Sequence, residues 1–356
     1  MFNFKDKTIL VTGGTGSMGK TFVHRILSGR DFKPKKVIVF SRDEAKQYDM
    51  RMSYYNKNVA TEEILYENFL KLLEFRIGDI RNYADVCSAI KDADIVVNAA
   101  ALKQVPTCEY FPVQALSTNC IGVANIVRAI QENNYKVDTV IGISTDKACK
   151  PINVMGMTKS LQERIFISAN ILAPNTRFIC VRYGNVLASR GSVIPLFHEQ
   201  IKNGGPLTIT DKEMTRFLLS LNNAVDTVLA AISHAQRGEI FIPKVPSANM
   251  LNIAKALIGN RDIKIKIIGV RPGEKTHEIL VSEEEIHHCI DKGDYYAILP
   301  MLPELQSSRA QIINVLKKEL CSSDFMLDLK QTKSLLKKNK LMIEDVKDIS
   351  SLELLK

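Results

Sequence analysis

The sequence predicts an α/β fold in which a doubly wound parallel sheet carries a smaller mixed domain. Two observations lead to this prediction. Apolar, strand-like runs alternate with helix-length segments through the first half of the chain, and such alternation gives a parallel sheet covered by helices on both faces. A glycine-rich turn directly follows the first of these runs, which is where nucleotide-binding sheets place their first loop.

Six apolar runs account for the predicted sheet. They are KTILVTGG, KVIVFSRD, LEFRIGDI, DIVVNAAA, DTVIGIST and, after a helix expected to contain Met155 to Lys159, RFICVRYGNV. Beyond them the pattern breaks into shorter pieces: SRGSVIPLF, the glycine turn of NGGPLTIT, a helix near Asn222 to Gln236, and GEIFIPKV. These pieces suit a smaller mixed domain that closes over the carboxyl ends of the strands.

The chain therefore divides into three predicted parts. Residues 1–184 form a nucleotide-binding domain, and residues 185–295 form mainly a ligand-binding domain that is interleaved with the sheet. Residues 296–356 form a basic helical extension. The stretches LKKEL, DLKQTK and LLKKNK lie there and contribute much of the net charge of +9. We expect a solvated amphipathic tail; weak attraction to an anionic membrane surface or an anionic sugar nucleotide stays open.

Composition excludes several classes of protein. A chain of 356 residues with 46% hydrophobic content is expected to be a soluble globule. The apolar run near the N-terminus is too short for a signal peptide or a membrane span, so we expect a cytoplasmic protein. The seven cysteines form no C-x-x-C pair, and the adjacent residues His287, His288 and Cys289 point in different directions on a helix, so no metal is expected. Basic stretches without interleaved aromatic residues argue against nucleic-acid binding.

A glycine fingerprint follows the first predicted strand. In VTGGTGSMGK, Gly13, Gly16 and Gly19 stand between that strand and a helix, so the backbone N–H groups of the turn can reach a pyrophosphate. The spacing G-x-x-G-x-x-G is typical of the Rossmann domain of short-chain dehydrogenases/reductases. We expect the loop to contact the cofactor through these residues: Gly13, Thr15, Gly16, Ser17, Met18 and Gly19.

The end of the second strand favours NADP over NAD. Ser41 and Arg42 come first at its tip and suit a 2′-phosphate, because they offer a hydroxyl donor and a planar cation. Asp43 would favour NAD if it turned inward, so NAD stays open. Asp79 and Ile80 are expected beside the adenine. Further along the dinucleotide we expect Ala99, Ala100, Ala101, Lys103, Asn119 and Lys159.

Seven motifs in a fixed order identify a family. They are GGTGSMG, GDIRN, AAALKQVP, STDKA-x-x-PIN-x-MG, RYGNV-x-ASRGSVIPLF, ITD-x-x-MTRF and RPGEK-x-HE. Together they resemble the configuration-inverting UDP-N-acetylglucosamine 4,6-dehydratases, extended short-chain dehydrogenases/reductases that make precursors of pseudaminic acid, capsule and O-antigen sugars. The resemblance runs from about residue 5 to about residue 285. It is weak over the last seventy residues, and nothing functional is carried onto them.

The resemblance implies a lyase acting on UDP-N-acetylglucosamine with NADP. Hydride leaves sugar C4 for the cofactor and returns at C6, while a proton leaves C5 and water leaves from C6. Reprotonation of C5 from the other face inverts that centre, giving UDP-2-acetamido-2,6-dideoxy-β-L-arabino-hex-4-ulose. The resemblance also implies a homo-oligomer, specifically a hexamer.

The resemblance assigns the elimination to neighbouring residues. Asp146 would be the acid toward the C6 oxygen and Lys147 the base at C5. A lysine serves as a base only if its pKa falls, and we expect burial and a nearby cation such as Lys159 to lower it. Thr145 would bond the sugar C4 oxygen, and Lys159 would hold the nicotinamide ribose hydroxyls.

The resemblance also indicates the residues that hold the sugar nucleotide. Three arginines offer planar donors for the diphosphate, and Glu274 suits ribose hydroxyls. Lys103, which follows the fourth strand, is placed to reach the sugar or a phosphate. The predicted substrate-binding set is Lys103, Asn185, Arg190, Val193, Arg216, Arg271 and Glu274.

Met155 stands where a large class of nicotinamide enzymes has the tyrosine of Tyr-x-x-x-Lys. A thioether cannot ionise, so Met155 can only pack, and Lys147 or a bound water relay must take the C4 hydroxyl proton. A capsule-type branch of the resembled family has methionine here. Orientation contributes roughly 7–11 kcal/mol and a positioned base about 10²–10⁴-fold, so we expect an active enzyme.

Two other functions stay open. One is a related sugar-nucleotide enzyme that stops at C4 epimerisation or adds later steps, although epimerisation does not use the pair Asp146 and Lys147. The other is a non-catalytic NADP-sensing regulator or scaffold, suggested by Met155. Such a protein would be expected to lose that pair and the arginines, and here they are all present.

Overall fold

A nine-stranded sheet forms the centre of the computed structural model, which describes residues 4–29, 31–55, 63–187, 192–306 and 315–345. Its first six strands in the chain are parallel, as the alternation predicts. In spatial order the sheet runs β14 (Cys289–Asp291), β15 (Tyr295–Ile298), β10 (Ile240–Pro243), β6 (Arg177–Val181), β5 (Thr139–Ile143), β4 (Ile95–Asn98), β1 (Thr8–Thr12), β2 (Lys36–Ser41) and β3 (Leu73–Ile77).

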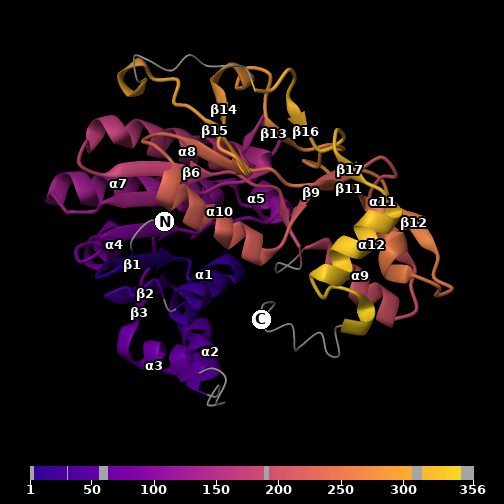
Figure 1. Ribbon diagram of the computed structural model, residues 1–356, viewed down its shortest axis with the longest axis horizontal. Coiled ribbons are helices and arrows are strands. Elements are labelled where there is room, and N and C mark those ends of the chain that lie inside the picture. The colour runs from indigo at the N-terminus through magenta and orange to yellow at the C-terminus, as the bar shows by residue number, and fades with distance from the viewer. Residues whose placement is uncertain (1–3, 30, 56–62, 188–191, 307–314, 346–356) are drawn as a thin grey trace.

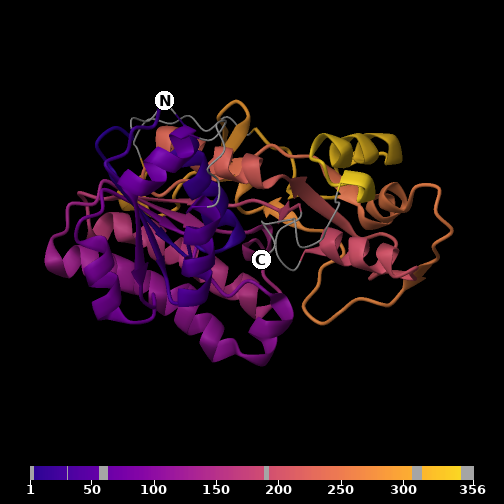
Figure 2. The same ribbon diagram turned by 90° about the horizontal axis from the view of Figure 1, so that it is seen from below.

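Helices cover both faces of this sheet (Figures 1 and 2). Successive strand side chains point to opposite faces, so Leu10 and Ile38 join one core while Ile9 and Val37 join the other. One face packs against α4 (Tyr83–Ile90), α7 (Gly122–Asn133) and α8 (Val154–Leu172); the other against α1 (Ser17–Ser28), α2 (Glu44–Tyr55), α3 (Glu63–Leu72) and α10 (Leu221–His234). The predicted doubly wound fold is confirmed.

The smaller part of the molecule has its own core, and three short sheets stand beside the central one. The largest of these pairs β17 (Met326–Leu327), β11 (Ser247–Asn249), β9 (Thr215–Leu219) and β7 (Asn185–Val186). The other two pair β12 (Ile265–Ile267) with β8 (Leu207–Ile209), and β13 (Ile279–Val281) with β16 (Leu320–Cys321). The helices beside them are α9 (Val193–Lys202), α11 (Met250–Ile258) and α12 (Leu329–Lys338).

Short helical segments complete the described chain. They are α5 (Val105–Tyr110), α6 (Pro112–Leu116), the π-helix η2 (Ser117–Ile121), and the 3₁₀ turns η3 (Asp146–Ala148), η4 (Ile286–His288), η5 (Pro303–Leu305) and η6 (Ile343–Asp345). Within the described ranges, no helix combines the length and apolar character that a membrane crossing requires.

The basic stretches near the C-terminus take two different structures. DLKQTK and LLKKNK form α12, which packs against α11 and buries Leu336, as the expected amphipathic helix would. LKKEL instead leads into β16. The expectation of helix there was wrong, because pairing with β13 decides the conformation of this short stretch.

A buried ion network lies at the end of β6 and centres on Arg182. Arg182, which follows β6, is 1% exposed and lies 2.7 Å from an oxygen of both Glu163 in α8 and Glu285. Ser144, at the end of β5, donates to Glu163 at 2.6 Å. Burial alone would lower the pKa of Arg182, but the two carboxylates outweigh it and raise that pKa. The network joins the central sheet to the segment that precedes η4.

Candidate active site

A cavity of about 1010 Å³ opens at the carboxyl ends of the parallel strands. Ligands of open α/β sheets bind at this edge. The first residue after each of β1, β2, β3, β4 and β5, and the second after β6, lines the cavity: Gly13, Arg42, Gly78, Ala99, Ser144 and Tyr183. The opposite wall comes from the smaller part of the molecule, through β7, β9 and the segment between β12 and β13.

The cavity brings together nearly every residue that the sequence predicts for the site. On the nucleotide side these are Gly13, Thr15, Gly16, Ser17, Met18, Gly19, Ser41, Arg42, Asp79, Ile80, Ala99, Ala100, Ala101 and Lys103. On the reacting side they are Thr145, Asp146, Lys147, Met155, Lys159, Asn185, Val193, Arg216, Arg271 and Glu274. Arg190 lies outside the described residues. The binding roles given to these residues stay predictions.

Asn119 lies behind the cavity wall. Its side chain is fully buried, accepts a hydrogen bond from the Leu102 amide at 2.9 Å and donates to the Leu102 carbonyl at 2.9 Å. It also donates to the Thr158 hydroxyl at 3.0 Å. Asn119 therefore fixes the loop that carries Lys103, and any effect of Asn119 on a cofactor would pass through that loop.

The glycine loop has the shape of a pyrophosphate cradle. Gly13 has φ +63°, and a Cβ there would lie 2.7 Å from the backbone of Ala100. A Cβ on Gly19 would lie 2.5 Å from the Cα of Gly14. The loop can pass this close to its neighbours only with glycine, and it leaves the N-terminus of α1 facing the cavity. These residues fit a dinucleotide.

Two cations line the far end of the nucleotide side. Arg42 is 59% exposed, and Lys46 stands beside it in the cavity wall. Asp43 forms an ion pair with Lys46 and accepts a hydrogen bond from the Lys46 amide at 3.0 Å, so its carboxylate is engaged at the start of α2. Gln47 donates to the Ser41 hydroxyl at 3.0 Å. Arg42 also lies 3.9 Å from Asp79 Oδ2. Cations of this kind suit a phosphate group, and the preference for NADP over NAD stays a prediction.

The Asp146–Lys147 pair sits at the start of η3, directly after the loop that follows β5. Lys147 Nζ lies 3.0 Å from Asp146 Oδ1 and 3.0 Å from Glu278 Oε1. The Thr145 hydroxyl donates to Asp146 Oδ1 at 2.9 Å. Asp146 is fully buried, and its Oδ2 has no hydrogen-bond partner among the described residues. A buried carboxylate oxygen without a partner at a cavity wall suits a ligand that donates a hydrogen bond.

The expected fall in the pKa of Lys147 is wrong. Burial does act to lower this pKa, but the carboxylates of Asp146 and Glu278 outweigh it and raise the pKa above its ordinary value. The cation that opposes them is Arg216 rather than Lys159. Glu278 reverses the direction of the shift in the Lys147 pKa. It closes the motif RPGEK-x-HE, but no role was given to it, because it follows Lys147 by 131 positions and only the fold brings the two side chains together.

Lys159 is the lysine whose pKa falls. Burial lowers it to about 8, and no carboxylate lies within ion-pairing distance of Nζ in the described chain. The amine donates to the Ile143 carbonyl at 2.7 Å and to Gln162 Oε1 at 2.8 Å. A neutral amine has two hydrogens and one lone pair. These two bonds use both hydrogens, and Lys159 lines the cavity.

Met155 fills space beside that amine. It is 4% exposed, lines the cavity and packs with Cys108 and Ala115 in a small apolar cluster. Being four residues apart on α8, Met155 and Lys159 lie on the same helix face. The thioether therefore occupies the position from which a tyrosine would reach a substrate, as the sequence indicates.

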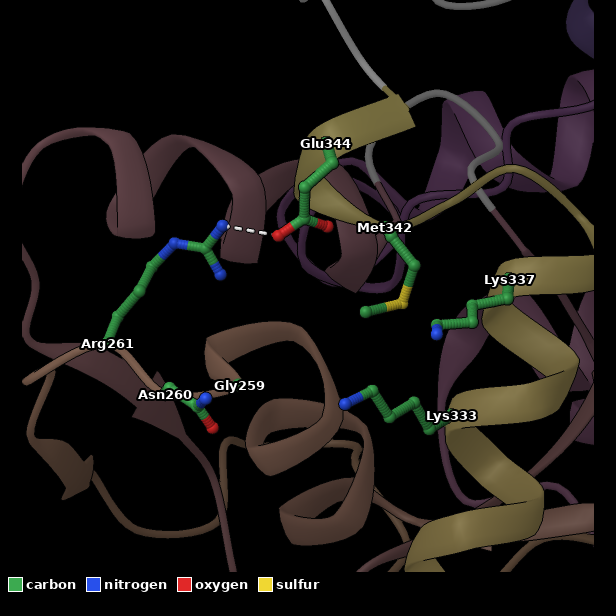
Figure 3. Close-up of a pocket in the computed structure, with 7 residues that line it drawn as sticks. All are labelled: Gly259, Asn260, Arg261, Lys333, Lys337, Met342 and Glu344. Atoms are coloured by element: carbon green, nitrogen blue, oxygen red, sulfur yellow. Dashed lines mark hydrogen bonds and ion pairs between the residues drawn. The ribbon is translucent and has the colours of Figure 1, made fainter.

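A second cavity, of about 440 Å³, lies between the C-terminal end of α11 and α12 (Figure 3). Lys333 and Lys337 point into it from α12. Arg261 on its other side is engaged with Glu344 at 2.6 Å and with the Ile258 carbonyl at 2.9 Å. None of the residues predicted for the site lines this cavity.

The comparison with protein families decides the membership of the chain. The model of the family described as "Polysaccharide biosynthesis protein" matches residues 9–300. This chain belongs to that family. The chain is 48% identical over 300 residues to a protein named UDP-glucose 4-epimerase from Rickettsia bellii (strain OSU 85-389), with 83% of each chain covered. A Rickettsia prowazekii protein of the same name is 46% identical over 301 residues, again with 83% of each covered.

Solved structures agree on the fold of this family member. Pen from Bacillus thuringiensis is 34% identical with a TM-score of 0.84, covering 96% of this chain and 100% of that one. A dTDP-glucose 4,6-dehydratase from Streptomyces venezuelae, solved with NAD and TYD, is 18% identical with a TM-score of 0.63, covering 76% and 86%. The predicted extended short-chain dehydrogenase/reductase fold is confirmed, and the choice between dehydratase and epimerase falls to the chemistry of the site.

Proposed function

We propose that this chain is an NADP-dependent UDP-N-acetylglucosamine 4,6-dehydratase that inverts C5. The observation that carries the proposal is the Asp146–Lys147 pair, buried at the carboxyl end of β5 with one carboxylate oxygen left without a partner. Elimination of water needs both an acid and a base beside the sugar, whereas reversible oxidation at C4 needs neither at C5 and C6. The bound cofactor would supply the hydride acceptor for C4 and the hydride donor for C6.

Each side chain of the reacting wall has a separate task. Thr145 orients the sugar through the C4 oxygen. Lys159 accepts the C4 hydroxyl proton, directly or through a ribose hydroxyl, because its amine has the lowered pKa and Lys147 does not. Lys147 exchanges the proton of C5, and Asp146 delivers a proton to the departing C6 oxygen. This division replaces our expectation that Lys147 or a water relay serves C4.

The nucleotide half of the substrate meets the opposite wall. Arg216, Arg271 and Glu274 line the cavity from β9 and from the loop after β12. Asn153 at the start of α8 donates to the Gly273 carbonyl at 2.7 Å, which ties this loop to the catalytic helix. Guanidinium groups suit a diphosphate. The Oε2 atom of Glu274, which has no hydrogen-bond partner among the described residues, suits a ribose hydroxyl.

A UDP-sugar 4-epimerase is the second candidate. The name of the Rickettsia relatives favours it, since they are 46–48% identical over 83% of the chain. Epimerisation would leave the 6-hydroxyl in place and exchange no proton at C5. It would also leave the buried Asp146–Lys147 pair without a task.

NMR of the reaction in deuterated water separates the two functions. Purified protein is incubated with UDP-N-acetylglucosamine, and in parallel with UDP-glucose, with NADP or NAD added. We expect a 4-keto-6-deoxy product from UDP-N-acetylglucosamine with deuterium at C5, formed faster with NADP. A C4 epimer that retains its 6-hydroxyl would establish the epimerase. Absence of turnover with both sugars would favour a regulator, and a Lys147→Ala variant with unchanged cellular function would point the same way.

A further inference from the structure

A second carboxylate contacts the Lys147 ammonium at the same distance as Asp146. Glu278 Oε1 and Asp146 Oδ1 each lie 3.0 Å from Lys147 Nζ. Glu278 is 1% exposed, and Lys147 is 19% exposed. Both acids line the cavity. The proposed chemistry gives tasks to Asp146 and Lys147 and leaves Glu278 without one.

The backbone of Glu278 is held in place by Ser322. Its backbone N–H donates to the Ser322 hydroxyl at 2.9 Å, and its carbonyl accepts from the Ser322 amide at 2.8 Å. Arg216 Nε lies 3.8 Å from Oε1, and Oε2 has no hydrogen-bond partner among the described residues. A buried carboxylate is costly unless it is paired. A fixed acid in this position therefore indicates a charge that the site needs.

The charges during elimination show at which stage the negative charge of Glu278 is needed. For Asp146 to protonate the C6 oxygen, it must first be neutral. For Lys147 to remove the C5 proton, it must become an ammonium at the same stage. Asp146 alone would then leave a buried ammonium without a counter-ion, which is strongly unfavourable. Glu278, at 3.0 Å, supplies the missing negative charge.

We propose that Glu278 is a positioning residue of the dehydration, which stabilises the protonated Lys147 while Asp146 carries the proton for the C6 oxygen. The inference rests on the proposed function and deepens it. It explains why two acids surround one amine.

The proton balance closes over one elimination. A proton moves from Lys147 Nζ to Asp146 Oδ1, leaving a neutral amine and a carboxylic acid. The amine takes the C5 proton first, and the electron pair of the C5–H bond moves toward the C4 carbonyl oxygen as an enolate, so Lys147 is an ammonium while Asp146 is still an acid. The enolate then forms the C5–C6 double bond as the C6–O bond breaks and Asp146 gives its proton to that oxygen, so water leaves. Lys147 is again an ammonium, Asp146 is again a carboxylate, and Glu278 has stayed anionic throughout.

The groups that face the amine come from four elements. Asp146 approaches from η3, Glu278 from the segment before β13, Arg216 from β9, and Asn185 Oδ1 from β7 at 3.4 Å. Two of them are anions and one is a cation. Removal of the Glu278 charge would leave one anion and one cation, so Lys147 would lose its proton more readily.

The full-length Glu278→Gln variant tests the inference with UDP-N-acetylglucosamine as the probe. We expect kcat to fall by roughly 10²-fold with KM unchanged, because a step after binding is affected. Reduced cofactor, followed by its absorbance in single turnover, should accumulate, and deuterium uptake at C5 should slow by the same factor as kcat. The pH profile of elimination should move to lower pH by about 1–3 units. Glu278→Asp should recover part of the rate.

Control variants separate the possible failures. Glu283→Gln changes an exposed acid just after β13 and should behave as the parent protein. If the parent forms no 4-keto product, the proposed function fails. If the parent is active and Glu278→Gln matches it in kcat and pH profile, the inference alone fails. A Glu278→Gln variant that loses substrate binding and cofactor reduction as much as elimination would also overturn the inference. Should the Gln variant not fold, wild-type kinetics in Glu278→Asp would be the overturning result.

Discussion

Lys159 is a buried amine with a pKa of about 8, and it lines the cavity. Four groups around it favour its charged form: Glu163 and the thiols of Cys108, Cys120 and Cys180. Burial raises the pKa of all three thiols, so they stay neutral near pH 8, and the Glu163 carboxylate is engaged with Arg182. Desolvation therefore decides the protonation of Lys159.

The first hydride transfer should depend on this amine. Because the pKa is lowered, Lys159 is charged below about pH 8 and neutral above it, so the rate of cofactor reduction in single turnover should rise with pH through about 8 and then level. Rapid-mixing absorbance measures it. A Lys159→Met variant should lose the rise and most of the rate. A rate that is flat across this range in the parent protein would contradict the assignment.

At the scale of single residues, the sequence predicts the identity of the site better than its protonation. Asp146, Lys147 and Glu274 lie in the cavity where their motifs place them. The pKa of Lys147 is raised, whereas the sequence predicted that it is lowered, because Glu278 lies beside Lys147 although it is far away along the chain. Lys46 was missed because it lies in the first turn of α2, and only the fold brings that turn to the cavity wall. Charge depends on neighbours in space, which spacing along the chain does not give.

The contact between η3 and α8 determines where Lys147 lies. Gly156, in the first turn of α8, would with a Cβ approach the Lys147 carbonyl oxygen to 2.2 Å. Its amide donates to Asn153 Oδ1 at 2.7 Å, which caps the helix. The helix can start this close to the catalytic turn only with glycine.

Gly156→Ala should therefore impair catalysis with little effect on the cofactor. The methyl group must displace the Lys147 backbone, and a displacement of about 1 Å can cost 10²-fold in rate. We expect kcat to fall by roughly that factor while cofactor affinity, measured by fluorescence titration, stays near that of the parent. Met157→Ala, on the exposed side of the same turn, should leave both unchanged. Equal activity in the two variants would show that η3 can move without loss.

Elements differ in how far their sequence predicts them. Strands β1, β2, β4, β5 and β6 are buried along most of their length, so they appear as near-continuous apolar runs and were predicted. Strand β3 was also predicted, although it lies at the edge of the sheet and is only partly buried. Strands β13 and β16 have three and two residues, too few for any periodicity. They form because they pair with each other across some forty positions, and the sequence alone could not show that pairing.

For the molecule as a whole, the buried charges of Arg182 connect stability to the site. Arg182→Ala would leave Glu163 and Glu285 buried without a counter-ion. Breaking such a pair costs about 3–5 kcal/mol, so the urea midpoint of unfolding should fall clearly. Circular dichroism measures it. Arg128→Ala, which removes an exposed pair with Glu132, should leave the midpoint unchanged. Similar midpoints for the two variants would mean that the carboxylates take up protons instead.

The return of the chain to the sheet limits how the protein can be dissected. Strands β10, β15 and β14 add to the sheet from residues 240–298, and Glu278 and Glu285 travel with them. A gene fragment that stops at residue 184 would encode the dinucleotide cradle but lack three strands of the central sheet and Glu285, one of the two carboxylates that pair with Arg182. Truncation mapping and split-protein reporters therefore have no natural cut point between the cofactor half and the sugar half.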